Sequence, residues 1–288
     1  MNYKEFPFYQ QTTLELIFNN TVEIYRKFFG WLFFFSFLFL LMMNVVSGYL
    51  IADKFQDLEH IVDHPELMVG VFSSLGKYLF ICWLGYSLYY LFIHYFIIIK
   101  YLEPEKSHGV MFMDILKKYY LKYLIITLLS SFIIGLGTMI GILAFIIGSV
   151  VAAIFLGVSL VPITPILIVE ETGIWETIKR SFRLVLKDFW QVLGFLIIFY
   201  LIYMLFSLIF GAIAMAPYAG GFFFNMLHPA EDTSAITNSF QLLNQPVYLI
   251  LNSLLTALIT PLVPVFTVLI YFHLKFKEDQ EGAMIVEG

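Results

Sequence analysis

Four polar side chains that could support chemistry stand near the ends of long apolar segments: His94, Glu170, Glu171 and His273. Such residues are candidates for function, because burying them in lipid is costly. Carboxylates together with imidazoles could bind zinc or relay protons. Alternatively, Glu170 and Glu171 begin the next helix, where a carboxylate complements the N-terminal dipole, and pair with nearby Lys or Arg. The pattern favours this second interpretation.

The sequence gives little support for an enzyme. Intramembrane CAAX-type proteases carry two glutamates followed three residues later by arginine, and Trp175 stands at that place here. No histidine with the spacing of their second motif follows, and the sequence contains no Walker loop, no Gly-x-Ser-x-Gly elbow and no cysteine pair. We therefore predict no catalytic residues, no metal and no cofactor. A metal-dependent intramembrane enzyme is kept as the third functional hypothesis.

A second pair of potential metal ligands, His60 and His64, lies in an acidic segment between the first two predicted spans. Residues four apart share a helical face, and two imidazoles there are compatible with zinc or copper. A solvated acidic loop, depleted of Lys and Arg by membrane topology, explains the same residues without a metal. We favour the loop.

Membrane-spanning helices must position these side chains. Hydrophobic residues form 60% of the sequence and charged residues 13%, with mean hydropathy +0.87, which excludes a soluble domain with one ordinary core. A hydrocarbon core about 30 Å thick needs about 20 apolar residues per helix. We predict an all-α integral membrane bundle of about six transmembrane helices, forming a single membrane domain over residues 1–288. The predicted spans lie near 29–52, 70–99, 124–143, 147–169, 190–216 and 247–273.

The stretch 124–169 is too long for one crossing, since as one helix it would reach roughly 69 Å at 1.5 Å per residue. The segment from Gly141 to Gly148 is the best candidate for a turn within it, because glycine permits the backbone angles of a short reversal. Gly137 and Gly141 also have the spacing that lets two helices pack closely. We expect that packing to occur within the hairpin.

The distribution of basic residues supports six crossings. If the chain starts inside and crosses six times, 14 of the 16 Lys and Arg residues lie on the inner side. With a single crossing in 124–169, 8 residues would lie on each side. Basic residues collect in cytoplasmic loops, so six spans with both termini in the cytoplasm is the better interpretation.

A unit of three elements occurs about three times: a cytoplasmic amphipathic helix, an outgoing span and a returning span. The amphipathic helices are predicted near 11–28, 109–122 and 173–189, where apolar residues follow helical spacing and charged residues occupy the other face. Such helices lie in the membrane plane with the apolar face down. Their cations either mark topology alone or bind anionic lipid headgroups. The headgroup candidates are Arg26, Lys27, Lys179, Arg180 and Arg183.

Two predicted spans carry paired prolines, Pro162 with Pro165 and Pro261 with Pro264. Each proline lacks a backbone donor and frees the carbonyl four residues earlier, so both helices should bend or break. Freed carbonyls could coordinate an ion or polar substrate, as in many transporters. We favour a structural break, in which Thr164 and Thr260 help to satisfy backbone groups.

Two stretches resemble a known membrane family. One runs from Pro162 through Glu170 and Glu171 to Phe189 and Trp190, and the other is the Leu-Ile-Tyr-Phe-His-Leu-Lys segment ending at Lys275, ahead of an acidic tail. They resemble the glycerophosphoryl diester phosphodiesterase membrane-domain group and its uncharacterised bacterial relatives. In that family the membrane region can accompany a soluble phosphodiesterase barrel with acidic, histidine and metal-binding residues, for which the segments between these spans are too short. The resemblance therefore implies the fold and not the hydrolase activity.

Two functional hypotheses remain ahead of the enzyme. The favoured one is a non-enzymatic protein of the bacterial cytoplasmic membrane that handles lipids or supports a partner assembly, because it has three basic interfacial helices and is rich in Phe and Tyr. The alternative is a small-solute transporter that uses the proline-broken helices. The predicted partners are membrane lipids and another membrane protein, and the sequence has no separate basic domain for nucleic acid.

Overall fold

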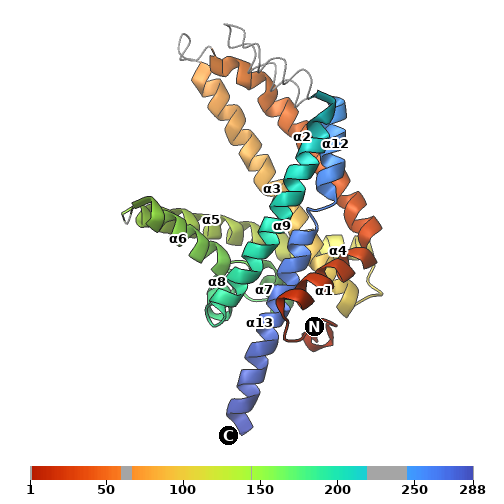
Figure 1. Ribbon diagram of the computed structural model, residues 1–288, viewed down its shortest axis with the longest axis vertical. Helices are drawn as coiled ribbons and strands as arrows, with labels where there is room; N and C mark the ends of the chain where they lie inside the picture. The colour runs from red at the N-terminus through yellow and green to blue at the C-terminus, as the bar shows by residue number, and fades with distance from the viewer. Residues whose placement is uncertain (1, 60–66, 144, 219–244, 288) are drawn as a thin grey trace. The chain divides into compact units, whose positions relative to one another are not determined.

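The protein is described by a computed structural model that places residues 2–59, 67–143, 145–218 and 245–287 (Figure 1). These residues form helices and no strand, which confirms the all-α prediction. The acidic segment with His60 and His64 lies outside the described residues. The chain forms two compact units. Unit 1 contains Met1–Phe28, Ser87–Leu201 and Leu262–Gly288, and unit 2 contains Phe29–Tyr86 and Ile202–Pro261.

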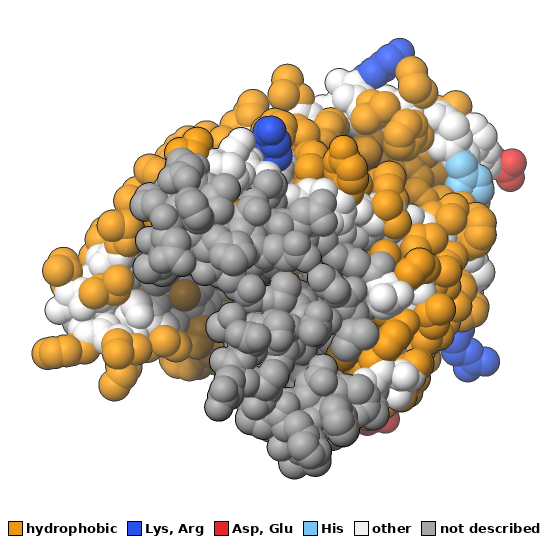
Figure 2. Space-filling model, turned by 90° about the horizontal axis from the view of Figure 1, so that it is seen from above, with side chains coloured by type: hydrophobic (Ala, Val, Ile, Leu, Met, Phe, Trp, Pro, Cys, Tyr) orange, Lys and Arg blue, Asp and Glu red, His pale blue; other side chains and the backbone are white. Residues whose placement is uncertain are grey.

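Within the described residues, six helical stretches are long and apolar enough to cross a membrane, which confirms the predicted number of spans and indicates an integral membrane protein. Hydrophobic side chains make up most of the coloured surface in Figure 2, with only a few charged side chains among them. The six stretches are Phe29–Leu50, Met68–Leu102, His108–Ile142, Phe145–Val169, Phe189–Tyr218 and Pro246–Ala283.

Two of the three predicted amphipathic helices are separate elements. Helix α1 (Leu14–Lys27) begins after Thr13, whose side chain accepts a hydrogen bond from the Leu16 N–H at 3.3 Å. Helix α8 (Ile174–Leu186) has the stronger division into a polar and an apolar face.

The middle amphipathic segment differs from the prediction because it is continuous with a span. Helix α4 (His108–Asp114) passes through a π-helical stretch, η2 (Ile115–Tyr120), directly into α5 (Leu121–Ile142). A π-helical stretch keeps the backbone hydrogen-bonded while shifting the register of side chains, so no loop is needed between the two parts.

The predicted hairpin within 124–169 is confirmed. Helices α5 and α6 (Phe145–Ser159) lie side by side in unit 1 and reverse near residue 143 (Figure 1). A Cβ atom on Gly141 would lie 2.6 Å from the Gly148 carbonyl oxygen, and one on Gly137 would lie 2.2 Å from Leu156 Cδ1. The two glycines therefore allow close packing within the hairpin, as predicted.

Both proline pairs break their helices, as predicted. Helix α6 ends at Ser159 and α7 (Ile163–Val169) begins after Pro162. Four residues separate α12 (Pro246–Ala257) from α13 (Leu262–Glu287), which begins after Pro261. The second proline of each pair, Pro165 or Pro264, lies in the first helical turn, where backbone N–H groups have no intrahelical partner.

Short local hydrogen bonds satisfy carbonyls at these breaks. Pro162 cannot donate to the Val158 carbonyl, which instead accepts from the Val161 N–H at 3.2 Å. At the second break Thr260 Oγ1 donates to the Thr256 carbonyl at 2.9 Å, the role predicted for it. Thr164 instead donates to the Tyr123 hydroxyl at 3.3 Å. These contacts fit a structural break.

In unit 1, aromatic rings join α1 to the beginning of α9 (Phe189–Met215) and to α13. Phe199 stacks on Phe266 with ring centroids 4.1 Å apart, and Phe18 of α1 lies 5.5 Å from Phe266. Ile17 and Ile24 on the same side of α1 are fully buried. Burial of this face fixes α1 against α13 within unit 1.

In unit 2, α2 (Phe29–Glu59) packs against α12, and Met43 of α2 lies beside Gly85 of α3 (Leu67–Leu102). Asn44 Nδ2 donates to Ser253 Oγ at 2.8 Å, a polar contact between two apolar helices. We expect Asn44→Ala to lower the free energy of unfolding by about 1 kcal/mol, as for other interhelical hydrogen bonds in membranes. A double-mutant cycle with Ser253→Ala in detergent unfolding measures the coupling. Purely additive losses would show that the contact contributes nothing.

Candidate functional site

Helix α8 divides its side chains between a buried and an exposed face. The buried residues follow i, i+3, i+4, i+7 spacing, which places them on one side of the helix. They include Thr177, Arg180, Ser181 and Leu184. The exposed side carries Trp175, Glu176, Lys179, Arg183 and Leu186. One basic helix therefore contains a buried cation and two exposed ones.

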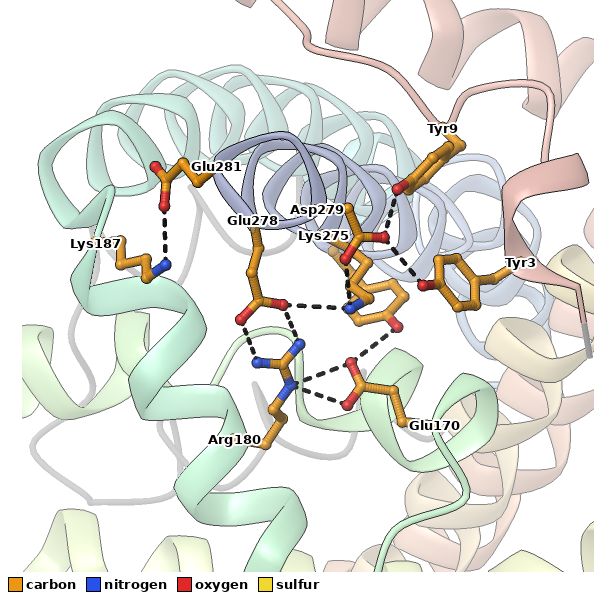
Figure 3. Close-up of polar contacts among 10 residues, drawn as sticks. Tyr3, Tyr9, Glu170, Arg180, Lys187, Lys275, Glu278, Asp279 and Glu281 are labelled. Atoms are coloured by element: carbon orange, nitrogen blue, oxygen red, sulfur yellow. Dashed lines mark hydrogen bonds and ion pairs between the residues drawn. The ribbon is translucent and has the colours of Figure 1, made fainter. Parts of the chain in front are cut away.

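The buried cation, Arg180, is held by two carboxylates (Figure 3). Its Nε donates to Glu170 Oε2 at 2.9 Å, and its two terminal nitrogens form a bidentate pair with Glu278, one contact being 2.6 Å. Tyr271 Oη donates to the same Glu170 at 3.2 Å. Only 8% of the Arg180 side chain is exposed. Hydrogen bonds to Glu278 and then to Glu170 raise the pKa of Arg180 above its ordinary value, against the effect of burial.

The contacts extend to the N-terminal segment through Asp279, the neighbour of Glu278 on α13. Lys275 Nζ lies 3.3 Å from Glu278 and 2.9 Å from Asp279. The hydroxyls of Tyr3 and Tyr9 donate to Asp279 at 3.0 and 2.6 Å, respectively. Burial and the hydrogen bond to Asp279 raise the pKa of Tyr9, so this hydroxyl keeps its proton and remains a donor. We call Arg180, Glu170, Glu278, Lys275 and Asp279 the Arg180 network.

Arg180, one of the predicted headgroup candidates, is buried in this structure, unlike Lys179 and Arg183. Its guanidinium has two carboxylate partners inside unit 1, and moving it to the surface would leave Glu170 without a cation and Glu278 with Lys275 alone. The network joins α8 to α13 and to the residues just before α8. The predicted pairing of Glu170 with a nearby cation is confirmed. The prediction that Glu170 and Glu171 begin the next helix is wrong, because Glu170 caps the end of α7 and α8 begins at Ile174.

The exposed face of α8 keeps the other two predicted cations available. Lys179 Nζ lies 6.0 Å from the ring centroid of Trp175, which is 57% exposed. Arg183 follows one turn later and is exposed, and Trp190, at the start of α9, is 80% exposed. Tryptophan favours the membrane–water interface, where its ring contacts apolar chains and its N–H contacts polar groups. This arrangement matches the headgroup level of a bilayer.

Helix α1 also exposes its two predicted cations. Lys27 Nζ lies 4.2 Å from the ring centroid of Tyr101 and 5.4 Å from that of Phe28. Arg26 lies beside a shallow cleft of about 650 Å³. The cleft is lined by Asn19, Val22, Glu23, Arg26 and Lys27. Glu23 lies among the cations of this cleft, as Glu176 lies beside Lys179 on the exposed face of α8.

The four polar candidates do not gather into one centre. Glu171, which has a positive φ of 50°, accepts a hydrogen bond from the Tyr119 hydroxyl at 2.7 Å. His273 Nδ1 accepts from the Thr12 N–H at 2.9 Å, and His94 Nδ1 lies 2.7 Å from the Tyr90 carbonyl oxygen. Among the residues that the structure places, no three His, Cys, Asp or Glu side chains lie close enough to hold a metal ion. Each candidate therefore has a separate local partner.

Sequence reasoning missed the partners at the two ends of the chain. It treated Glu278 and Asp279 as an acidic tail after the last span, whereas α13 continues as helix to Glu287. It also gave no role to the N-terminal segment, where Phe6 stacks on the buried Phe272 at a centroid distance of 3.9 Å. The available signal was the i, i+3, i+4 charge pattern of Lys275, Glu278 and Asp279, which is typical of a helix.

The fold and these surfaces define an all-α integral membrane protein with basic, tryptophan-flanked helices. The chain belongs to the family described as Domain of unknown function (DUF7847), which matches residues 112–274, more than half of the chain. The match contains Glu170 and all of α8 but ends before Lys275. No curated protein and no solved structure matches the chain. The resemblance to the glycerophosphoryl diester phosphodiesterase membrane-domain group stays a prediction.

Proposed function

We propose that this protein is a non-enzymatic lipid-binding protein of the bacterial cytoplasmic membrane, in which α8 binds anionic phospholipid headgroups. The observation that carries the proposal is the exposed face of α8, where Lys179 and Arg183 lie one turn apart beside Trp175. An exposed cation near an anionic membrane surface contributes about 1 kcal/mol to binding. Two such cations on a fixed helix can contact one phosphate group together. Both chain termini are cytoplasmic in this proposal.

The Arg180 network supports this role by fixing the helix that carries the exposed cations. Arg180 is anchored to Glu170 and Glu278, which holds α8 in one orientation. Lys179 and Arg183 therefore stay on the exposed face of the helix. A preorganised surface loses less conformational entropy when a ligand binds. We propose that the buried arginine positions α8 and that the exposed cations contact lipid.

The confirmed helix breaks are the observation that favours transport as a second candidate. A transport site would need freed carbonyls that are open to a solute. At the first break, however, the Val158 carbonyl accepts from Val161 and the Ser159 carbonyl accepts from Ser181 Oγ at 2.7 Å. These satisfied carbonyls favour lipid binding over transport.

Lipid titration of the detergent-solubilised full chain tests the proposal. We expect dioleoyl phosphatidylglycerol, which is anionic, to bind more tightly than dioleoyl phosphatidylcholine, which is zwitterionic. The double variant K179Q/R183Q should weaken phosphatidylglycerol binding roughly 30-fold, because it removes about 2 kcal/mol of attraction. Binding can be followed by the intrinsic fluorescence of the exposed tryptophans or by the ligand-dependent rise in unfolding temperature.

The matched control is K117Q/K118Q, which removes the same charge from exposed positions of η2. We expect this control to change phosphatidylglycerol binding less than threefold. Equal losses in both double variants would mean that only diffuse surface charge attracts the lipid. Equal binding of the two lipids by the wild-type protein would overturn the proposed function.

A further inference from the structure

Unit 1 contains an apolar groove between α6 and the first half of α9, next to the end of α8. Its first part is about 530 Å³ and its second about 470 Å³, and the two parts share Ile154 and Leu193. The first part is lined by Val151, Ile154, Phe155, Leu186, Phe189, Trp190 and Leu193. The second is lined by Ile154, Gly157, Val158, Val161, Leu193, Leu196, Ile197 and Tyr200. Nearly all of this lining is hydrocarbon.

The groove begins where the cationic face of α8 ends. Leu186 lines the groove and lies three residues after Arg183, so both exposed side chains share one face of α8. Trp190, on the same part of the lining, is 80% exposed. A ligand that follows this surface would contact positive charge first and then hydrocarbon. A phospholipid has the complementary arrangement, with an anionic phosphate next to apolar chains.

The length of the groove fits one leaflet of a membrane. Along α9 the lining runs from Phe189 to Tyr200, which is roughly 16 Å at 1.5 Å per residue. Half of a hydrocarbon core about 30 Å thick is about 15 Å. A groove of this length could accommodate one extended acyl chain of a lipid whose headgroup lies at the interface.

We infer that the α6–α9 groove binds an acyl chain of an anionic phospholipid whose phosphate contacts Arg183 and Lys179. The inference rests on the proposed function and adds the part of the lipid that the protein recognises. The complementary charge of α8 and the apolar lining select a lipid over a soluble phosphate compound. They also select it over a second copy of the chain, for which the exposed cations would be repulsive at close approach.

Gly157 offers a way to fill the groove without disturbing the backbone. It lines the second part of the groove, and a Cβ atom built on it would have no heavy atom within 4 Å. Gly157→Leu therefore adds a side chain to open space. Gly194→Leu is the matched control, because Gly194 lies on α9 with equally open space and does not line either part of the groove.

The experiment compares dioleoyl and dihexanoyl phosphatidylglycerol, together with glycerol 3-phosphate as a soluble headgroup probe, on the full-length protein. We expect the wild type to bind the dioleoyl lipid at least tenfold more tightly than the dihexanoyl lipid, and glycerol 3-phosphate more weakly still. Gly157→Leu should lose most of this preference for long chains, while Gly194→Leu keeps it. Both variants should unfold at the wild-type temperature or above, because glycine is replaced in a helix.

The outcomes separate this inference from the proposed function. If K179Q/R183Q weakens lipid binding but Gly157→Leu keeps the chain-length preference, the headgroup site stands and the groove inference is overturned. If neither change affects binding, both are overturned. If Gly157→Leu abolishes the preference while K179Q/R183Q has no effect, the groove stands and the headgroup role of α8 is overturned. Equal binding of glycerol 3-phosphate and the dioleoyl lipid would assign the cations to a soluble phosphate compound.

Discussion

Replacing Arg180 with Ala is expected to lower the free energy of unfolding by about 3–5 kcal/mol. The change removes the cation that Glu170 and Glu278 share. Removing one partner of a buried ion pair is strongly destabilising, because the charge of the other partner stays buried without compensation. Arg180→Lys should recover little of this loss, because an ammonium group cannot make the bidentate contact with Glu278 while also reaching Glu170. Unfolding of the purified protein by increasing denaturing detergent measures the difference.

The matched control uses an exposed ion pair near the end of α8. Lys187 Nζ lies 2.9 Å from Glu281, and their side chains are 45% and 48% exposed. Because water screens such a pair, Lys187→Ala should cost at most about 1 kcal/mol. A loss for Arg180→Ala as small as that for Lys187→Ala would contradict the assignment of Arg180 as the buried anchor of α8.

Replacing Gly141 with Leu is expected to cost about 3 kcal/mol, the second largest effect. A Cβ atom there would meet backbone atoms, with Gly148 O at 2.6 Å and Ser149 Cα at 2.8 Å. Side chains can change rotamer, but a backbone contact forces α5 and α6 apart and removes their close packing. The same detergent unfolding assay measures this loss.

Two other glycines of α5 provide controls for this substitution. Gly135→Leu should be neutral or slightly stabilising, since its added Cβ would meet nothing within 4 Å and leucine favours a helix. Gly137→Ala should cost less than Gly141→Leu, because its nearest contact is the flexible end of Leu156. If Gly135→Leu and Gly141→Leu destabilise the protein equally, the effect belongs to glycine replacement in general and the hairpin contact is not its cause.

Much of the fold could be predicted because the membrane imposes simple rules on a sequence. The length of 124–169 required a reversal, and the glycines around Gly141 indicated its position. Proline chemistry predicted the breaks at Pro162 and Pro261. These features depend on local backbone properties and on the thickness of the hydrocarbon core, both of which can be assessed along a single segment.

The Arg180 network could not be predicted in the same way, because its partners are distant in sequence. Arg180 and Glu278 are 98 residues apart, and Tyr9 and Asp279 are 270 residues apart. The sequence analysis placed Arg180 on the charged face of the amphipathic helix together with Lys179 and Arg183. The helical spacing of Arg180 with Thr177, Ser181 and Leu184 was the available sign that it belongs to the buried face. The carboxylates that make its burial tolerable are visible only once the helices are placed.

Native mass spectrometry of the protein released gently from its own membrane tests the central claim most directly. We expect the wild type to retain an anionic phospholipid in defined stoichiometry, K179Q/R183Q to lose most of it, and K117Q/K118Q to retain it. Wild-type protein that carries no phospholipid, or that carries the same amount as K179Q/R183Q, would contradict the account of α8 as a lipid-binding helix.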